Sequence, residues 1–296
     1  MRNLWHSFLH RRYEKKLEKQ AKSTGEPTFS GLVSQMCTQA QMRSPEYLAW
    51  CEQGKIDTVF RRKKWEYCYI LQALKEYGQI APGRRGLGFG VGRECLVPVL
   101  AQNGCSIMAT DLPQPQAQEK GWVDGSQYAG TLAGLNTEGL CESEAFARLV
   151  SYRDVNMNEI PEDLVEFDFL WSACAFEHLG SIERGLQFVE RAMRCLKPGG
   201  IAVHTTEFNL ASNRWTIHKG GTVLFRRKDI EQLAKRLEAQ GHWVAPRNYH
   251  PGQGELDHHV DVPPYQWAPH LRLMIGAFAA TSFGIIIRKG STQPIQ

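Results

Sequence analysis

Three glycines and one aspartate have the spacing of a site for a nucleotide-like cofactor. Gly88, Gly90 and Gly92 form a GxGxG pattern, and Asp111 ends the next apolar segment 19 residues after Gly92. Glycine has no Cβ, so the backbone can turn tightly and approach a ligand at the start of the following helix. A carboxylate at the end of the next strand can accept both hydroxyls of a ribose. The pattern therefore predicts a site for an adenosine-bearing cofactor.

Two related phosphate-binding patterns are absent. The dinucleotide pattern GxGxxG fails because Arg93 stands at its last position when the frame starts at Gly88, and Val91 when it starts at Gly86. The pattern GxxxxGK[ST] does not occur in the chain either. We expect the helix after the glycine turn to cover about residues 94–103.

The order of the downstream segments carries the strongest sequence signal. Residues 167–172 have the pattern of a buried strand, residues 182–195 that of a helix, and the Leu-Lys-Pro-Gly-Gly run at 196–200 that of a helix stop before a strand over 201–206. This succession resembles the class I S-adenosylmethionine-dependent methyltransferases over roughly residues 65–288. The resemblance implies a doubly wound, seven-stranded, mostly parallel α/β sheet of Rossmann-like type, with S-adenosylmethionine as the cofactor.

Two segments, residues 171–180 and 204–209, look similar to a bacterial-type branch of this family that is associated with small molecules or glycans. The resemblance implies transfer of the methyl group to an oxygen or nitrogen of a small-molecule or glycan acceptor by in-line displacement. Two alternatives stay open. One is an RNA methyltransferase that uses basic N-terminal helices, and the other is a noncatalytic scaffold that binds S-adenosylmethionine.

The resemblance also implies which residues bind the cofactor. Asn156 and Met157 would contact the adenine, with Asp154 as an alternative, and the family's usual acid two residues before the first glycine is replaced by Gly86. Glu94 is the alternative partner for the methionine amino group that this acid serves. The full set of implied cofactor-binding residues is Gly88, Gly90, Gly92, Asp111, Asn156, Met157 and Ser172.

Methyl transfer needs a positioned nucleophile and a base. Positioning can supply about 7–11 kcal/mol, and a base adds roughly 10²–10⁴ in rate. Ligands of open α/β sheets bind outside the carboxyl ends of the strands, which points to Glu177 and His178 after the fourth strand and to His204 and Glu207 at the fifth. We predict His178, His204 and Glu207 as catalytic residues, with His178 or His204 taking the proton.

Metal binding is a weaker interpretation. Some relatives hold a divalent metal with a Glu-x-x-Glu-His cluster, but Cys174 replaces the first glutamate here, and Glu177 with His178 can equally cap the next helix. We therefore predict no metal. For the loop over residues 250–270, metal binding, substrate contact and a solvated loop all remain open. The acidic and histidine side chains of this loop are His250, Glu255, Asp257, His258, His259, Asp261 and His270.

The predicted domain organisation has an N-terminal helical cap over residues 1–64 and a methyltransferase domain over residues 65–296. Within that domain, residues 112–149 form an unusually long connection, which we interpret as a lid, and residues 250–270 form a substrate loop. In the lid, Trp122 and Tyr128 would either shield a ligand or anchor the loop. Further expected elements are two helices over 45–77, a third strand over 150–155, a sixth strand over 243–249 and a last strand over 281–288.

Basic residues suggest two possible surfaces. Residues 4–17 combine apolar residues at helical spacing with many lysines and arginines, so this helix either packs on the domain or contacts an acidic membrane surface or a nucleic acid. Residues 61–64, all basic, are predicted to be a solvated helix face. The formal net charge of +4 is too mild to indicate nucleic-acid binding by itself.

The remaining composition suggests a cytoplasmic protein with a substantial core. Hydrophobic residues make up 42% of the 296 residues, and no apolar run is long enough to span a membrane. Eight cysteines occur without a CxxC pair and without a preceding apolar leader, so reduced thiols are expected rather than disulfides or a zinc ribbon.

Overall fold

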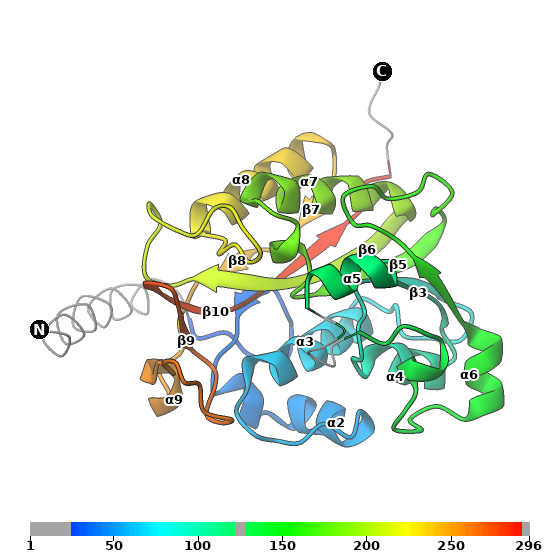
Figure 1. The fold of residues 1–296 in the computed structure, drawn as a ribbon, viewed down its shortest axis with the longest axis horizontal. Coiled ribbons are helices and arrows are strands. Elements are labelled where there is room, and N and C mark those ends of the chain that lie inside the picture. The colour runs from blue at the N-terminus through cyan, green and yellow to red at the C-terminus, as the bar shows by residue number, and fades with distance from the viewer. Residues whose placement is uncertain (1–24, 122, 124–127, 292–296) are drawn as a thin grey trace, which may run out of the picture.

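The structure is a computed structural model that describes residues 25–121, 123 and 128–291. Helices cover both faces of one central sheet (Figure 1). The doubly wound α/β fold expected from the sequence is therefore confirmed. The amphipathic helix predicted over residues 4–17 lies outside the described residues.

The described residues form one sheet of ten strands, in the order β4-β3-β2-β5-β6-β10-β1-β8, with β7 and β9 paired to β10 outside this path. The run from β4 to β6 is parallel, and β10 is antiparallel to its neighbours β6 and β1. The strands are β1 (Ser34–Met36), β2 (Arg85–Phe89), β3 (Ser106–Asp111), β4 (Val150–Asp154), β5 (Phe167–Ala173), β6 (Leu196–Asn209), β7 (Trp243–Val244), β8 (Arg247–Asn248), β9 (Leu273–Ile275) and β10 (Phe278–Arg288).

The helices separate into two layers. In Figure 1, α7 and α8 lie on one side of the sheet, and α2, α3 and α4 lie on the other. No helix within the described residues is long and apolar enough to cross a membrane. The helices are α2 (Pro45–Gln53), α3 (Arg62–Glu76), α4 (Leu96–Gln102), α5 (Gln114–Glu119), α6 (Ser143–Leu149), α7 (Ile182–Ala192), α8 (Arg227–Ala239) and α9 (Glu255–His258), with 3₁₀ turns η1 (Gln41–Arg43), η2 (Ala133–Leu135), η3 (Phe176–His178) and η4 (Met193–Cys195).

Helix α7 shows how local sequence sets an element. The Ser181 hydroxyl accepts a hydrogen bond from the Arg184 backbone N–H at 3.2 Å, which caps the first turn. Leu186 and Val189 on its inner face are buried, so the helix is held on the sheet by apolar contact. The helix predicted over 182–195 is confirmed as α7 followed by η4.

The N-terminal segment contributes more than the helical cap that we expected. Strand β1 inserts beside β10 and pairs with β8 on its other side. The predicted sixth strand over 243–249 is accordingly split into β7 and β8. Ala245 N donates to Ile286 of β10, but Pro246 has no N–H for this ladder, and its carbonyl accepts from Ser34 N instead. The chain thus stops pairing with β10 at Pro246, and β1 lies between β10 and β8.

The long connection over 112–149 is not a structureless loop. It contains α5, the turn η2 and α6, and the buried Phe146 of α6 joins the core cluster that includes Leu100 of α4. Gln116 of α5 and Lys120 just after it line the cavity described below. The connection therefore consists of a packed part and a part that faces this cavity.

Helix α3 packs closely on β10 through the ring of Tyr69 in the middle of the helix. A Cβ on Gly284 of β10 would lie 2.1 Å from the Tyr69 ring of α3. The Tyr69 hydroxyl donates to the Val33 carbonyl at 2.7 Å, which also ties the helix to the segment before β1. Only glycine permits this approach of ring to strand.

We expect Gly284→Ala to lower the free energy of unfolding by about 1–3 kcal/mol, because the added methyl group must displace the ring of Tyr69 or the strand. Urea denaturation would measure the change. Gly25→Ala is the control, since nothing lies within 4 Å of a Cβ at that position. Equal stability of the two variants would show that α3 can shift without cost.

Candidate active site

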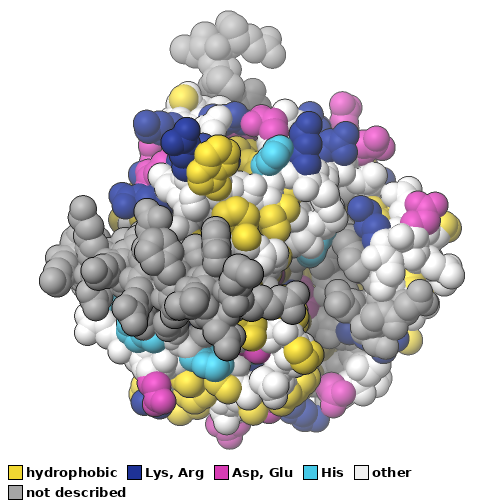
Figure 2. All heavy atoms as spheres, turned by 60° about the vertical axis from the view of Figure 1, so that its left-hand side comes forward, with side chains coloured by type: hydrophobic (Ala, Val, Ile, Leu, Met, Phe, Trp, Pro, Cys, Tyr) yellow, Lys and Arg dark blue, Asp and Glu magenta, His cyan; other side chains and the backbone are white. Residues whose placement is uncertain are grey.

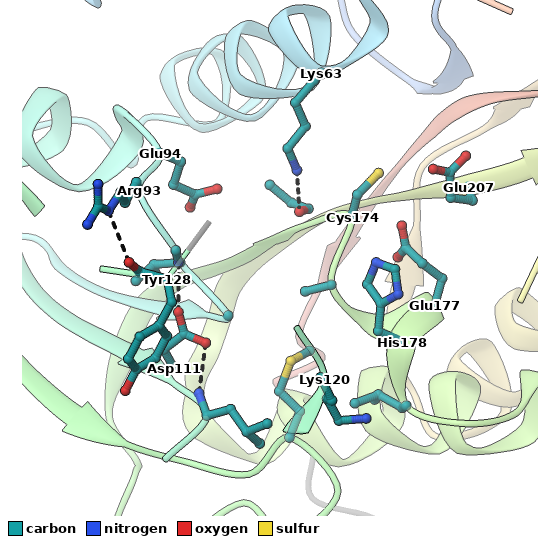
Figure 3. A pocket seen from close by; sticks show the side chains of 18 of the residues that line it. Lys63, Arg93, Glu94, Asp111, Lys120, Tyr128, Cys174, Glu177, His178 and Glu207 are labelled. Carbon is teal, nitrogen blue, oxygen red and sulfur yellow. Dashed lines mark hydrogen bonds between the residues drawn. The ribbon is translucent and has the colours of Figure 1, made fainter. Parts of the chain in front are cut away.

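A cavity of about 620 Å³ opens at the carboxyl ends of β2, β3, β4 and β5. Its lining differs from one part to the other, as the labelled side chains in Figure 3 illustrate. The part that we call the glycine half contains Gly90, Gly92, Glu94, Asp111, Asn156 and Met157. The part that we call the acidic half contains Arg62, Lys63, Cys174, Glu177, His178 and Glu207.

The glycine turn follows β2 and exposes backbone to the cavity. Gly90 and Gly92 have φ of 61° and 48°, the left-handed region that glycine adopts without strain. A Cβ on Gly90 would lie 2.9 Å from the Cβ of Ala175, so a side chain there would fill the cleft. Gly88 has a different place, because its Cβ position faces the ring of Trp171 at 2.4 Å. Gly88 allows packing inside the sheet layer and does not line the cavity.

Asp111 lies at the base of the glycine half. Its two carboxylate oxygens accept from the backbone N–H groups of Gly92 at 2.9 Å and Leu112 at 2.7 Å. Burial raises the pKa of the carboxyl to about 6, although both hydrogen bonds lower it. The carboxylate is held rigidly by backbone and has lone pairs left for further donors.

Residues after β4 form the other wall of the glycine half. Asn156 and Met157 both line the cavity, as the sequence predicted for the adenine contact. The Asn156 side-chain oxygen accepts from Asn158 N at 3.0 Å, which fixes a tight turn. Asp154, the alternative residue, stands at the end of β4 but does not line the cavity.

Packing explains why Gly86 replaces an acid. A Cβ on Gly86 would lie 2.4 Å from the Phe169 ring, so this position of β2 has no room for a side chain. Glu94 instead brings a carboxylate to the cavity from the far side of the turn. It accepts from the Trp171 indole N–H at 2.7 Å, and burial raises its pKa to about 8.

Ser172 and His204 lie outside the cavity, although both were predicted as site residues. They are partners on adjacent strands β5 and β6, and both side chains are fully buried. The Ser172 hydroxyl and His204 Nδ1 are 2.8 Å apart, and the imidazole contacts the rings of Phe176 and Phe188 edge-on. Burial lowers the pKa of His204 to about 3.

The alternation of side chains along a strand accounts for this correction. Glu207 and His204 are three residues apart on β6, so they point to opposite faces of the sheet. Glu207 lines the cavity, whereas His204 does not. We therefore no longer assign His204 as the base or Ser172 as a cofactor contact.

Arg62 is the central cation of the acidic half. The residue begins α3, and its guanidinium forms ion pairs with Glu66 at 3.0 Å and with Glu207 of β6. It also donates to the Ser282 hydroxyl of β10 at 3.2 Å. The pKa of Arg62 is raised because the nearby carboxylates outweigh the effect of its burial.

Lys63 extends the same network. Its ammonium lies 3.2 Å from Glu66 and donates to the Ala173 carbonyl at 2.9 Å. The prediction that residues 61–64 form a solvated helix face is therefore wrong for Arg62, whose side chain is only 13% exposed, whereas Lys63 is 43% exposed and points toward the cavity. The basic run gave no local sign of the burial of Arg62, because its partners beyond its own helix come from β6 and β10.

Glu177 and Glu207 are the two buried carboxylates that line the acidic half. The Thr206 hydroxyl donates to Glu177 Oε2 at 3.2 Å, while Glu177 Oε1 and Glu207 Oε2 have no hydrogen-bond partner among the described residues. Burial, the largest cause, raises the pKa of each to about 7. The charge of Glu66 adds to both increases.

His178 lies beside Glu177 on the turn η3 (Figure 3). Its Nδ1 is 2.8 Å from the Gly221 carbonyl, which can only accept, so Nδ1 carries the proton. In the neutral ring the lone pair is then on Nε2. Burial lowers the pKa of His178, so the ring is neutral near pH 7.

Comparison with known families identifies the central segment. Residues 87–204 match the family model for a methyltransferase domain. The match covers 118 of the 296 residues and indicates a methyltransferase domain in this chain. Its activity is S-adenosylmethionine-dependent methyl transfer, and S-adenosylmethionine is its cofactor.

Solved structures of methyltransferases are similar to this chain with low sequence identity. A putative sarcosine dimethylglycine methyltransferase from Galdieria sulphuraria is 16% identical, with 78% of this chain and 85% of that chain covered and a TM-score of 0.46. TehB from Haemophilus influenzae is also 16% identical, with 75% and 61% covered and a TM-score of 0.46. No curated protein sequence matches the chain.

The glycine half of the methyltransferase has the features that its cofactor requires. The space beside Gly90 exists only because no Cβ fills it, and the rigid Asp111 carboxylate can accept from hydroxyl groups. Glu94 is a buried carboxylate whose pKa is raised to about 8 by burial, although the charge of Lys63 lowers it. S-adenosylmethionine has ribose hydroxyl groups that could donate to Asp111 and a methionine ammonium that could pair with Glu94.

A metal site is not formed by the residues that suggested one. Within the described ranges, no group of three or more histidine, cysteine, aspartate and glutamate side chains is placed to hold a metal ion. Cys174 has φ of 48° and its backbone N–H donates to the Thr205 carbonyl at 3.0 Å. The strained backbone turns the chain from β5 into η3 and so carries Glu177 and His178 into the cavity.

The predicted substrate loop of the methyltransferase is anchored by its acidic residues. Asp257 pairs with the buried Arg272 at 3.3 Å, and Asp261 Oδ2 lies 2.6 Å from His270 Nδ1. His270 lines the cavity, and its backbone pairs with Phe60 and Arg62 at the start of α3. This loop therefore reaches the acidic half through His270, one of the histidines for which the sequence left substrate contact open.

We expect Asp111→Asn to weaken binding of S-adenosylhomocysteine at least about tenfold, because an amide oxygen is a poorer acceptor for two hydroxyls than a carboxylate. Isothermal titration calorimetry at pH 7.5 would measure the dissociation constant. Asp163→Asn, an exposed change on the surface, is the matched control. The same dissociation constant for wild type and Asp111→Asn would contradict the assignment of this carboxylate to the ribose.

Proposed function

We propose that the protein methylates an oxygen or nitrogen of a small molecule or of a glycan residue, and that this acceptor binds in the acidic half of the cavity. The volume of about 620 Å³ lies within the range of small-molecule sites, roughly 300–1,000 Å³. We also propose that the protein belongs to the bacterial-type branch associated with small molecules or glycans, and that it is cytoplasmic.

The observation that carries the proposal is the position of His178. It follows β5 in the same cavity as the glycine turn, and its Nδ1 bond to Gly221 leaves Nε2 as the basic nitrogen. We propose that Nε2 accepts the proton of the acceptor as it reacts. Glu207, also predicted as catalytic, is paired with Arg62. We propose that Glu207 binds the acceptor and that it does not act as the base.

For the cofactor, we propose that Gly88, Gly90 and Gly92 shape the turn beside the methionine and ribose, and that Asp111 binds the ribose hydroxyls. Asn156 and Met157 would contact the adenine. We add Glu94 as the partner of the methionine ammonium, in place of the acid excluded at Gly86 by Phe169. The cofactor supplies an electrophilic methyl group, and the protein supplies orientation and charge.

For the domain organisation, we propose a cap over residues 1–64 on a methyltransferase domain over 65–296. The connection over 112–149 would act as a lid through α5, and residues 250–270 would contact the acceptor through His270. Nothing favours the RNA alternative in the residues described. Figure 2 shows acidic side chains interspersed with basic ones along the upper part of its face, and Arg62 and Lys63 are occupied inside the protein.

We expect His178→Gln to lower kcat by about 10²–10⁴, because glutamine cannot accept the proton. The dissociation constant of S-adenosylhomocysteine should stay within about twofold of wild type, since the ring lies in the acidic half. The assay is mass spectrometry of the methylated product formed from a panel of hydroxyl and amino compounds. His259→Gln, in the exposed part of the substrate loop, is the control, and an unchanged kcat in His178→Gln would remove His178 as the base.

Glu94 leads to a prediction about pH. Its pKa of about 8 means that the carboxyl is largely protonated at pH 7, whereas an ammonium binds its ionised form. Binding must then release a proton, so affinity for S-adenosylmethionine should increase from about pH 6.5 to about pH 7.5. The increase should be absent in Glu94→Gln and present in the surface control Glu162→Gln. Calorimetry over this pH range would test it, and the same slope in Glu94→Gln would exclude the contact.

A further inference from the structure

The acidic half and the adjacent Glu66 of α3 together contain more buried carboxylates than basic side chains that pair with them. Three carboxylates, those of Glu66, Glu177 and Glu207, are at most 6% exposed. The cations that pair with them are Arg62 and Lys63. Since a buried charge without a partner is costly, this set needs one more positive charge or a bound proton.

Glu177 is the carboxylate of this set that has no ion-pair partner. Arg62 bridges Glu66 and Glu207, and Lys63 pairs with Glu66. Among the described residues no basic side chain forms an ion pair with Glu177, whose Oε2 accepts from the neutral Thr206 hydroxyl. Its carboxylate is fully buried in the protein and still lines the cavity.

Two other basic side chains around the cavity have contacts of their own. Arg61 lies over the ring of Trp267 at 3.9 Å, and Arg93 donates to the Tyr128 carbonyl at 3.0 Å in the glycine half. The charge of Lys63 acts on Glu177 without forming an ion pair with it. The negative charge of Glu177 is therefore only partly compensated.

Two oxygen atoms show where a ligand would bind. Glu177 Oε1 and Glu207 Oε2 are buried and have no donor within the described part of the chain. Both side chains line the acidic half, next to His178. Buried polar atoms are nearly always paired in proteins, so these two acceptors call for a donor that arrives with a ligand.

We propose that the methyl acceptor is a primary or secondary amine that binds as an ammonium ion between Glu177 and Glu207. An ammonium brings at least two N–H donors and one positive charge, which is what the two oxygens and the charge surplus require. A hydroxyl acceptor would bring a donor but no charge. This inference rests on the proposed function and specifies its acceptor class.

The chemistry follows from the same geometry. The bound ammonium gives one proton to Nε2 of His178, which leaves a neutral amine with a lone pair. That lone pair attacks the methyl carbon of the cofactor, the carbon–sulfur bond breaks, and its electron pair remains on the sulfur of S-adenosylhomocysteine. The product is an N-methylammonium, and the imidazolium of His178 then releases its proton to solvent. One proton is therefore released for each methyl group transferred.

The test measures binding to the wild-type chain saturated with S-adenosylhomocysteine, so that no reaction occurs. The probes are three amines, ethylamine, benzylamine and glucosamine, each compared by calorimetry with its hydroxyl counterpart, ethanol, benzyl alcohol and glucose. We expect at least one amine to bind about tenfold or more tightly than its counterpart. Glu177→Gln should weaken that amine about 10- to 100-fold, and Glu162→Gln, an exposed glutamate, should not.

Two results would overturn the inference. One is a panel in which no amine binds more tightly than its hydroxyl counterpart. The other is amine binding that is unchanged in both Glu177→Gln and Glu207→Gln. Binding of S-adenosylhomocysteine by each variant shows that it is folded. If the folded wild type itself fails to bind S-adenosylhomocysteine, the proposed function fails, which is a different outcome from loss of the preference for amines alone.

Discussion

The buried guanidinium of Arg62 is the interaction on which the rest of the site depends. It joins α3 to β6 through Glu207 and to β10 through Ser282, and it also holds Glu66 within its own helix. A charge taken out of water is stable only with close partners, so these elements must meet in one arrangement. Loss of the guanidinium would leave Glu66 and Glu207 buried with less compensation, and the acidic half would not keep its shape.

The parallel strands and α3 contribute different parts of the cavity. Strands β2, β3 and β4 deliver the glycine turn, Asp111 and the residues that follow β4, as expected where parallel strands end together. The acidic half needs α3 in addition, and α3 is positioned by the contact of Tyr69 with Gly284. Because β1 pairs with β10, the N-terminal segment around β1 helps to build the acidic half.

The titratable groups of the cavity share one property. Burial raises the pKa of Glu94, Asp111, Glu177 and Glu207 and lowers that of His178. Each shift favours the neutral form, because burial disfavours the charged form of a titratable group. A positively charged ligand would stabilise the ionised form of these carboxylates. Binding energy would then be gained at the carboxylates that the protein itself compensates least. His178 is already neutral and therefore able to accept a proton.

The sequence by itself determined the local features. The glycine turn, the position of Asp111 and helix α7 follow from spacing and periodicity within short segments, and the doubly wound order of strands follows from the family resemblance of these segments taken together. The tertiary structure decided which face each side chain occupies and what it meets. His204 looked catalytic until its strand register placed it among Phe176 and Phe188.

The basic residues at the start of α3 and the predicted sixth strand are two more features that the sequence alone did not predict correctly. Arg62 looked solvated because its partner Glu207 is 145 residues away in the chain. The sixth strand was split because Pro246 cannot donate to β10 and a strand from the N-terminal segment was available. Burial, charge pairing and strand insertion depend on contacts between distant segments, and local pattern carries no information about such contacts until the chain is folded.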